Sequence, residues 1–253
     1  MLNRKGIILA GGNGSRLHPL TYHISKQLLP VYDKPMIFYP ISTLMSCGVK
    51  DILIITQEKF VDNFKLLLEK TNKYDLNISF EIQNEAKGIA EALIIAENFL
   101  NGQKSILILG DNIIFGQNIE RALLSEYKTN KNVIFTKKVS NPERYGVVKY
   151  KNNKIEKIIE KPKKFTSNDA VIGLYFFEKK ISNLAKLLKP SNRGELEITD
   201  LNNVLIEKKR MIVKNLDDEV LWFDAGTHDS LLQCSNFVES VQKRSGKKIT
   251  KIY

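Results

Sequence analysis

KGIILAGGNGSRLHPLT, residues 5–21, carries the strongest structural signal in the sequence. Its apolar start, residues 6–10, stops at the run 11–16 (GGNGSR), and a short apolar run bounded by glycines is typical of a buried strand. A loop with three glycines in four positions can bend tightly and bring its backbone close to a ligand. Exposed backbone amides favour an anion there, and the guanidinium of Arg16 matches phosphate oxygens. The segment predicts a strand and a loop that binds nucleotide phosphates, with a plain glycine turn as the alternative.

This loop fits neither of two common phosphate-binding motifs. A P-loop ends in Gly-Lys-Ser/Thr, whereas Ser15 and Arg16 follow Gly14. The dinucleotide-binding fingerprint needs a third glycine where Leu17 stands. It also needs an acidic residue about 20 positions further on, and the next strand-like run, 51–56, comes too late to supply it. The sequence therefore predicts a phosphate loop of another type.

Length and composition indicate a globular α/β protein. The chain has 253 residues, of which 43% are hydrophobic and 26% charged, enough for one large domain or two small ones. No apolar run approaches the roughly 20 residues that span a bilayer, and no signal peptide is recognisable. Cys47 and Cys234 lie far apart without a metal-type spacing, so we expect reduced core cysteines and a cytoplasmic protein.

The net charge of +11 does not by itself indicate a nucleic-acid ligand. Lysines are spread along the whole chain, with a denser patch only at 242–251, and no nucleic-acid-binding motif accompanies them. We expect a lysine-rich solvated surface, no nucleic acid and no membrane partner. A small polyanionic substrate needs only a local basic site.

Strand-like and helix-like runs alternate in the first half, which predicts a doubly wound, mainly parallel sheet. Ligands of such sheets bind at the carboxyl ends of the strands. The glycine loop, Gln83 and Asp111 all fall at predicted strand ends. The predicted strands after the first are 51–56, 78–82 and 105–109, and the predicted helices are 36–48, 60–69 and 88–99.

Asp111 and Asp224 are the candidate metal ligands. Each follows a predicted strand, and a carboxylate at the end of a buried strand needs a cation beside it. Mg²⁺ prefers one or two carboxylates together with substrate phosphates. Capping of the following helix is the alternative for both aspartates, aided near Asp224 by Thr227.

The second half predicts antiparallel structure on the same core. Residues 147–150 and 155–160 read as a hairpin, and 170–177 as a further strand. No linker separates this part from the first half, so we expect one domain with a substrate-binding subregion. Other predicted elements are a strand at 132–139, a strand ending at Asp224, and helices at 181–188, 195–209 and 228–243.

Taken together, these motifs resemble those of the sugar nucleotidyltransferases, most closely the branch that transfers a thymidylyl group. The resemblance covers essentially the whole chain and implies a Rossmann-like sheet in a single domain, 1–253. Its nucleotide-binding part would be about 1–130 and its sugar-phosphate-binding part about 131–227, followed by a C-terminal helix and basic tail. The matching blocks are GGNGSRLHP (11–19), SKQLLP (25–30), YDKPM (32–36), GDN (110–112), PERYGV (142–147), EKP (160–162), Gly173-Leu174-Tyr175, RGELEITD (193–200) and DAGTH (224–228).

The resemblance implies that dTTP and glucose 1-phosphate give dTDP-glucose and pyrophosphate, by in-line attack of the sugar phosphate on the α-phosphorus. A phosphate dianion is nucleophilic near pH 7, so no general base is required, and the chain has only three histidines. Positioning and charge neutralisation would then supply the catalysis.

The resemblance also implies the site residues. Arg16 and Lys26 would hold the nucleotide phosphates, Asp111 and Asp224 would ligate Mg²⁺, and Lys161 would hold the sugar phosphate. Gln83 would read the thymine edge, Gly88 would leave room for the ring, and Glu160 would accept from sugar hydroxyls. The implied nucleotide-binding residues are Leu9, Ala10, Gly11, Gly12, Asn13, Gly14, Ser15, Arg16, Lys26, Gln27, Gln83, Gly88 and Asp111. The implied sugar-phosphate-binding residues are Asn112, Tyr145, Gly146, Glu160, Lys161 and Val171.

Two questions stay open at this level. The first is the substrate: thymine and uracil differ by only one methyl group, so the same chemistry with UTP or with another sugar 1-phosphate is an alternative. The second is activity itself, since a non-catalytic binding protein on this fold is the other alternative. The sequence lacks a C-terminal helical segment of the family that helps to form a regulatory nucleotide site and subunit contacts. We expect a homo-oligomer, dimer or tetramer, with weakened or absent regulation.

Overall fold

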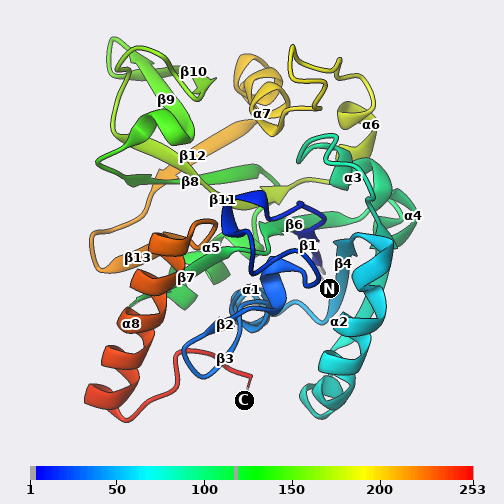
Figure 1. The fold of residues 1–253 in the computed structure, drawn as a ribbon. Helices are drawn as coiled ribbons and strands as arrows, with labels where there is room; N and C mark the ends of the chain where they lie inside the picture. Colours follow the sequence, from blue (N-terminus) through cyan, green and yellow to red (C-terminus); the bar gives the residue numbers. More distant parts are fainter. Residues whose placement is uncertain (1–3, 117–118, 253) are drawn as a thin grey trace.

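The computed structural model describes residues 4–116 and 119–252, and within them nine strands form one mixed sheet (Figure 1). The main strand order is β10-β9-β11-β6-β1-β4-β5, and β8 pairs with both β11 and β12. The strands are β1 (Arg4–Ala10), β4 (Asp51–Thr56), β5 (Asn77–Ile82), β6 (Lys104–Leu109), β8 (Asn132–Lys138), β9 (Gly146–Lys151), β10 (Lys154–Glu160), β11 (Asp169–Phe177) and β12 (Met211–Asn215).

Two strand pairs and a set of helices complete the described part of the chain. β2 (Pro30–Val31) pairs with β3 (Lys34–Pro35), and β7 (Asn112–Gly116) pairs with β13 (Val220–Asp224). The helices are α1 (Phe38–Ser46), α2 (Val61–Leu68), α3 (Glu91–Ile95), α4 (Glu97–Leu100), α5 (Ile119–Tyr127), α6 (Ile181–Ala185), α7 (Ile198–Glu207) and α8 (His228–Ser245).

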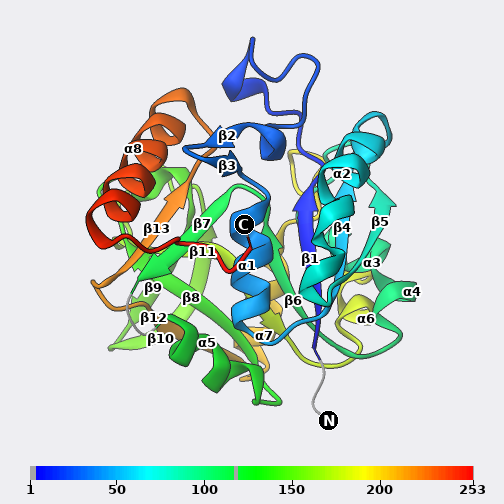
Figure 2. The ribbon, with the colours of Figure 1, turned by 90° about the horizontal axis from the view of Figure 1, so that it is seen from below.

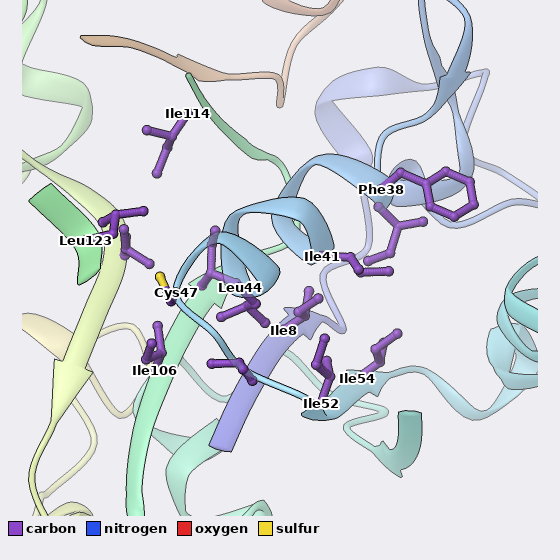
Figure 3. Packing of buried hydrophobic residues seen from close by; sticks show 14 of the residues in the cluster. Ile8, Phe38, Ile41, Leu44, Cys47, Ile52, Ile54, Ile106, Ile114 and Leu123 are labelled. Carbon is purple, nitrogen blue, oxygen red and sulfur yellow. The ribbon is translucent and has the colours of Figure 1, made fainter. Parts of the chain in front are cut away.

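The parallel part of the sheet is covered by helices on both faces, as the alternation of elements predicted. β1 lies between β4 and β6 and is parallel to both. Ile8 packs in a cluster with residues of α1, α2 and α5 (Figures 2 and 3). Its neighbour Ile7 packs in a second cluster with residues of α3, α4, α6 and α7. A strand that is buried on both faces requires an unbroken apolar run, which explains the composition of residues 6–10.

The sheet changes from parallel to antiparallel at β11. This strand is antiparallel to β6, β8 and β9, and β9 and β10 form the predicted hairpin. Asn152 and Asn153 have φ angles of 50° and 57°, and asparagine tolerates this left-handed conformation well. The α/β class with an antiparallel subregion is therefore confirmed.

Several elements differ from the sequence-based expectation. β7, β12 and α5 were not predicted, and the helix expected at 88–99 is two short helices, α3 and α4. Asp111 is followed by a strand and Thr227 is the N-cap of α8, so neither Asp111 nor Asp224 caps a helix. The capping alternative was wrong for both aspartates.

The basic segment after α8 packs back onto the domain. The backbone N–H of Lys251 donates to Ser42 Oγ on α1 (2.8 Å), and Ile252 is fully buried (Figure 2). Asp33, in the β2–β3 turn, accepts hydrogen bonds from Lys248 (2.7 Å) and from Gln242 of α8 (3.2 Å). Part of the basic patch predicted at 242–251 therefore packs against the rest of the protein and is not only a solvated surface. Among the described helices, none has the length and apolar character needed to cross a membrane.

Candidate active site

The glycine loop follows β1 at the carboxyl edge of the parallel strands. Gly14 has a φ of +65°, and the hydroxyl of Thr21 donates to its carbonyl (2.7 Å). Gln57, just after β4, donates to the carbonyl of Gly11 (3.1 Å). Leu17 is fully buried and anchors the short turn, whereas the Arg16 side chain is 55% exposed. The loop is thus fixed from both sides while its guanidinium stays accessible.

A cavity of about 260 Å³ opens beside this loop, between the parallel strands and the β9–β10 hairpin. Sequence-predicted residues from both halves of the chain meet there. Those that line it are Arg16, Asp111, Asn112, Tyr145, Gly146, Glu160, Lys161, Val171 and Asp224. The other predicted nucleotide residues lie on the adjoining strand and loops. A larger cavity, near α1 and α5, contains none of the predicted site residues.

The two candidate metal ligands are brought together by the β7–β13 pair. Asp224 is directly opposite Asn112, and the N–H of Ala225 donates to the carbonyl of Asp111 (3.0 Å). Lys26 makes an ion pair with Asp111. Two guanidinium groups lie near Asp224, Arg144 at 3.7 Å and Arg16 at 4.0 Å.

The surroundings drive the pKa values of the two carboxyls apart. Burial disfavours the charged form of Asp111, but the Lys26 ammonium outweighs it and holds the pKa of Asp111 below its ordinary value. Burial and the nearby charge of Asp111 raise the pKa of Asp224, despite the arginines. Ionisation of both carboxyls is therefore unfavourable in the free protein, and a divalent cation between them would favour it.

The donor set fits Mg²⁺ bound together with phosphate. Within the described residues, no group of three or more His, Cys, Asp or Glu side chains could hold a metal alone. Two carboxylates leave most coordination positions to phosphate oxygens and water, which is the usual arrangement for Mg²⁺. Asp111 and Asp224 are the residues that would hold it.

Cations surround the cavity at several points. Lys161 adopts a φ of +42°, and its N–H donates to the carbonyl of Tyr145 (2.9 Å). Its ammonium makes no ion pair in the part of the chain that the structure describes. Arg144 and Arg193 also line the cavity, and neither was among the predicted site residues although both lie in matching sequence blocks. Arg144 Nη2 is buried without a hydrogen-bond partner, and a phosphate oxygen could accept from it.

The far wall of the cavity is polar. Glu160, at the end of β10, accepts a hydrogen bond from Thr199 (2.6 Å), and Gly146 lies opposite it on β9. A Cβ at Gly146 would come within 3.2 Å of both Glu160 and Thr199. Asn202 is buried, and its Oδ1 has no hydrogen-bond partner. Such a wall suits a ligand rich in hydroxyl groups.

Gln83 and Gly88 lie together beside the glycine loop. Gln83 Nε2 donates to Glu91 (2.6 Å), and its Oε1 would be 2.7 Å from a Cβ at Gly11. Gly88 has a φ of +102°, and a Cβ there would meet the carbonyl oxygen of Leu196 at 2.3 Å. The close approach of Leu196 is the reason that the structure gives for glycine at this position.

The fold and the site define a nucleotidyltransferase: a doubly wound sheet with a glycine-rich loop, paired carboxylates and cations around one cavity. Residues 5–241 match the family model described as nucleotidyl transferase. The chain belongs to this family of enzymes.

Two curated relatives of this chain carry the same, more specific name. The chain is 46% identical over 240 residues to glucose-1-phosphate thymidylyltransferase of Neisseria meningitidis serogroup A, covering 94% of this chain and 83% of that protein. It is 42% identical over 246 residues to the protein of the same name from Mycolicibacterium smegmatis, covering 97% and 85%.

Two solved structures share the fold of this chain. A crystal structure described as a glucose-1-phosphate thymidylyltransferase of Bacillus anthracis in complex with sucrose has a TM-score of 0.84 and 38% identity. It covers 92% of this chain and 94% of that one. A UDP-glucose pyrophosphorylase with bound UDP-glucose shares the fold, with a TM-score of 0.82 and 24% identity over 94% of this chain and 99% of that one.

Proposed function

We propose that this enzyme makes dTDP-glucose and pyrophosphate from dTTP and glucose 1-phosphate, with Mg²⁺ as its cofactor. The names of the relatives at 42–46% identity support the substrates. The observation that carries the mechanism is a convergence of opposite charges. Lys26 pairs with Asp111 and Arg16 lies near Asp224, and both aspartates line the same cavity as Lys161 and Glu160.

The chain's own residues position and neutralise the reacting phosphates. Arg16 and Lys26 bind the triphosphate and the departing pyrophosphate, and Lys161 orients the sugar phosphate for attack on the α-phosphorus. The phosphate dianion is the nucleophile, so no side chain needs to remove a proton. Bound at Asp111 and Asp224, Mg²⁺ would supply further neutralisation of the negative charge on the α-phosphate.

The ammonium of Lys26 has a second task in this scheme. It occupies one oxygen of Asp111 in the free protein, and the triphosphate offers it a stronger set of oxygens. Transfer of Lys26 to the phosphates frees that carboxylate oxygen for the metal ion. Nucleotide and Mg²⁺ binding are therefore expected to favour one another.

Specificity is divided between Gln83, beside the glycine loop, and residues that line the cavity. Gln83 Nε2 is already engaged by Glu91, so its Oε1 remains to accept from the imide N–H of thymine. Glu160, with Tyr145, Gly146, Asn112 and Val171, binds the sugar ring. Because thymine and uracil share the imide edge, a contact to the methyl group must separate dTTP from UTP, and one methyl contact contributes about 1–3 kcal/mol.

A substrate panel tests the proposal. The purified protein is assayed with dTTP, UTP, CTP and ATP against several hexose 1-phosphates, with Mg²⁺ or with a chelator. The highest kcat/KM is expected for dTTP with glucose 1-phosphate, with pyrophosphate released in equal amount and no turnover in the chelator. Equal kcat/KM with UTP would contradict the thymidylyl assignment, and turnover in the chelator would contradict the metal.

The homo-oligomer, dimer or tetramer, is also part of this proposal and rests on the resemblance to the family. Light scattering on the purified protein measures it directly. A monomer at micromolar concentration would contradict it.

A further inference from the structure

Asn112, predicted as a sugar-binding residue, has its amide engaged inside the protein. Its Oδ1 accepts two hydrogen bonds, from the indole Nε1–H of Trp222 (2.6 Å) and from the backbone N–H of Gly173 (2.9 Å). Its Nδ2 donates to Asp111 Oδ1 (3.1 Å). Asn112 and Asp111 are 2% and 6% exposed, so water does not compete strongly for these bonds.

The two donors fix the orientation of the amide. An amide oxygen has two lone pairs, and both are used by Trp222 and Gly173. The reversed amide would set its NH₂ group against two N–H donors, which is unfavourable in a buried site. The NH₂ group is therefore directed at Asp111.

Asp111 is held at both of its oxygens as a result. Oδ1 accepts from Asn112, and Oδ2 is paired with Lys26. Lys26 is a flexible cation that we expect to move to the triphosphate, whereas Asn112 is a rigid neutral donor on β7. The amide is thus the contact that keeps the Asp111 carboxylate in place when Lys26 leaves it.

Trp222 is itself held in place. It lies on β13 opposite Ile114 of β7, and the ring of Tyr145 packs edge-on against it at 5.1 Å. The indole lines the sugar side of the cavity, so a plain wall for the sugar is the competing role. The hydrogen bond from Nε1–H to Asn112 is what a positioning role requires and a plain wall does not.

We propose that Trp222 is a positioning residue that acts through Asn112 to orient Asp111 toward the divalent cation. The inference rests on the proposed role of Asp111 as a metal ligand. Partners that orient a metal ligand typically contribute 10- to 100-fold to metal affinity. The second N–H of the Asn112 amide is left for a sugar hydroxyl, so this role is compatible with the proposed sugar-binding role of Asn112.

The chain permits a sharp test because Trp222 is its only tryptophan. Biosynthetic replacement of tryptophan by benzothienylalanine exchanges the indole N–H for sulfur and nearly preserves the ring shape. Replacement by 5-fluorotryptophan keeps the N–H and is the matched control. Trp222→Phe is a second variant without the donor, and melting temperatures verify that each protein folds.

The readout is Mn²⁺ affinity, measured by electron paramagnetic resonance of free Mn²⁺ in protein saturated with dTTP, without sugar phosphate. Titrations of dTTP alone give the background. Benzothienylalanine and Trp222→Phe are expected to raise the Kd for Mn²⁺ about 10-fold. The fluorinated protein should remain within about twofold of the wild type.

Unchanged Mn²⁺ affinity with a raised KM for glucose 1-phosphate would overturn the positioning role and leave Trp222 as a wall. An equal loss in the fluorinated control would overturn it as well, because the N–H is retained there. Asp111→Asn serves as the reference: if it leaves Mn²⁺ affinity intact, the proposed metal assignment fails. If it weakens Mn²⁺ binding while the donor-free proteins do not, only the inference about Trp222 fails.

Discussion

At the scale of single residues, Asp111 and Asp224 share a site but have opposite electrostatic surroundings. Burial acts against both charges, yet the Lys26 ammonium keeps the pKa of Asp111 low, whereas burial and Asp111 raise that of Asp224. Perturbed carboxyls of this kind concentrate at functional sites. Ionisation of Asp224 is therefore unfavourable in the free protein, and bound cations would relieve this cost.

Replacement of Asp224 by asparagine should stabilise the protein while abolishing its activity. The raised pKa means that ionised Asp224 costs folding free energy at pH 7, and asparagine removes that cost. We expect a melting temperature higher by about 2 °C or more and turnover reduced at least about 100-fold.

The gain in stability has a defined pH dependence. Below the ordinary value of 3.8 the wild-type carboxyl is protonated in both states, so the two proteins should differ little. The difference should grow as pH rises above 3.8 and become constant once pH exceeds the pKa of folded Asp224. Calorimetry from pH 3.5 to 7.5 measures it, and a variant less stable than the wild type at pH 7 would contradict the account.

Arg16→Ala should reduce activity without changing the stability of the protein. The side chain is largely exposed and its contact to Asp224 is 4.0 Å, so its removal should leave the melting temperature within about 1 °C. Loss of a charge-assisted phosphate contact should lower kcat/KM for dTTP about 100-fold. Arg244→Ala, an exposed arginine near the end of α8, is the control that should change neither quantity. Near-normal activity of Arg16→Ala would refute its phosphate role.

At the scale of elements, the sequence predicted those strands and turns whose formation depends on the residues of the segment itself. The apolar runs of β1, β4 and β6 and the polar tip at Asn152–Asn153 identified the parallel strands and the hairpin. β7 was missed because its partner β13 lies more than 100 residues away, and its five residues carry no periodic pattern. The Trp222–Asn112 bond spans 110 positions for the same reason. The candidate metal ligands Asp111 and Asp224 were predicted from strand ends. Four other residues line the same cavity but were identified only in the fold: Arg144, Arg193, Asn202 and Trp222.

The segment after α8 gives a test at this scale. Burial opposes ionisation of Asp33, but hydrogen bonds from Lys248, Lys34 and Gln242 prevail and lower its pKa from 3.8 to about 2. Asp33→Asn should therefore loosen the contact between the β2–β3 turn, α8 and the basic segment. We expect a melting temperature lower by about 2–4 °C at pH 7.

This contribution has the opposite pH dependence to that of Asp224. A lowered pKa stabilises the folded state above the ordinary value, and the contribution is lost as pH falls toward 2. The Asp33→Asn difference should thus be constant from pH 5 to 7 and shrink below about pH 4. Hydrogen exchange at the Lys251 N–H should become faster in Asp33→Asn. Unchanged exchange there would contradict a role of Asp33 in holding the basic segment against the domain.

At the scale of the whole molecule, the sheet acts as a rigid frame for side chains from distant segments. β1 and β6 place the glycine loop and Asp111 at one edge, and β9, β10 and β11 bring the polar wall to face them. Helices cover both faces, so the loops at this edge are the part left free for ligands. Among the residues that line the cavity there is neither cysteine nor histidine, and the proposed mechanism relies on charge and position alone.

The stereochemical course at the α-phosphorus tests this central claim most directly. One diastereomer of dTTP with sulfur on the α-phosphorus is converted with glucose 1-phosphate, and phosphorus NMR gives the configuration of the thio-substituted dTDP-glucose. Direct in-line attack by the sugar phosphate predicts inversion. Retention of configuration would reveal a nucleotidyl intermediate on a protein side chain and would contradict the account.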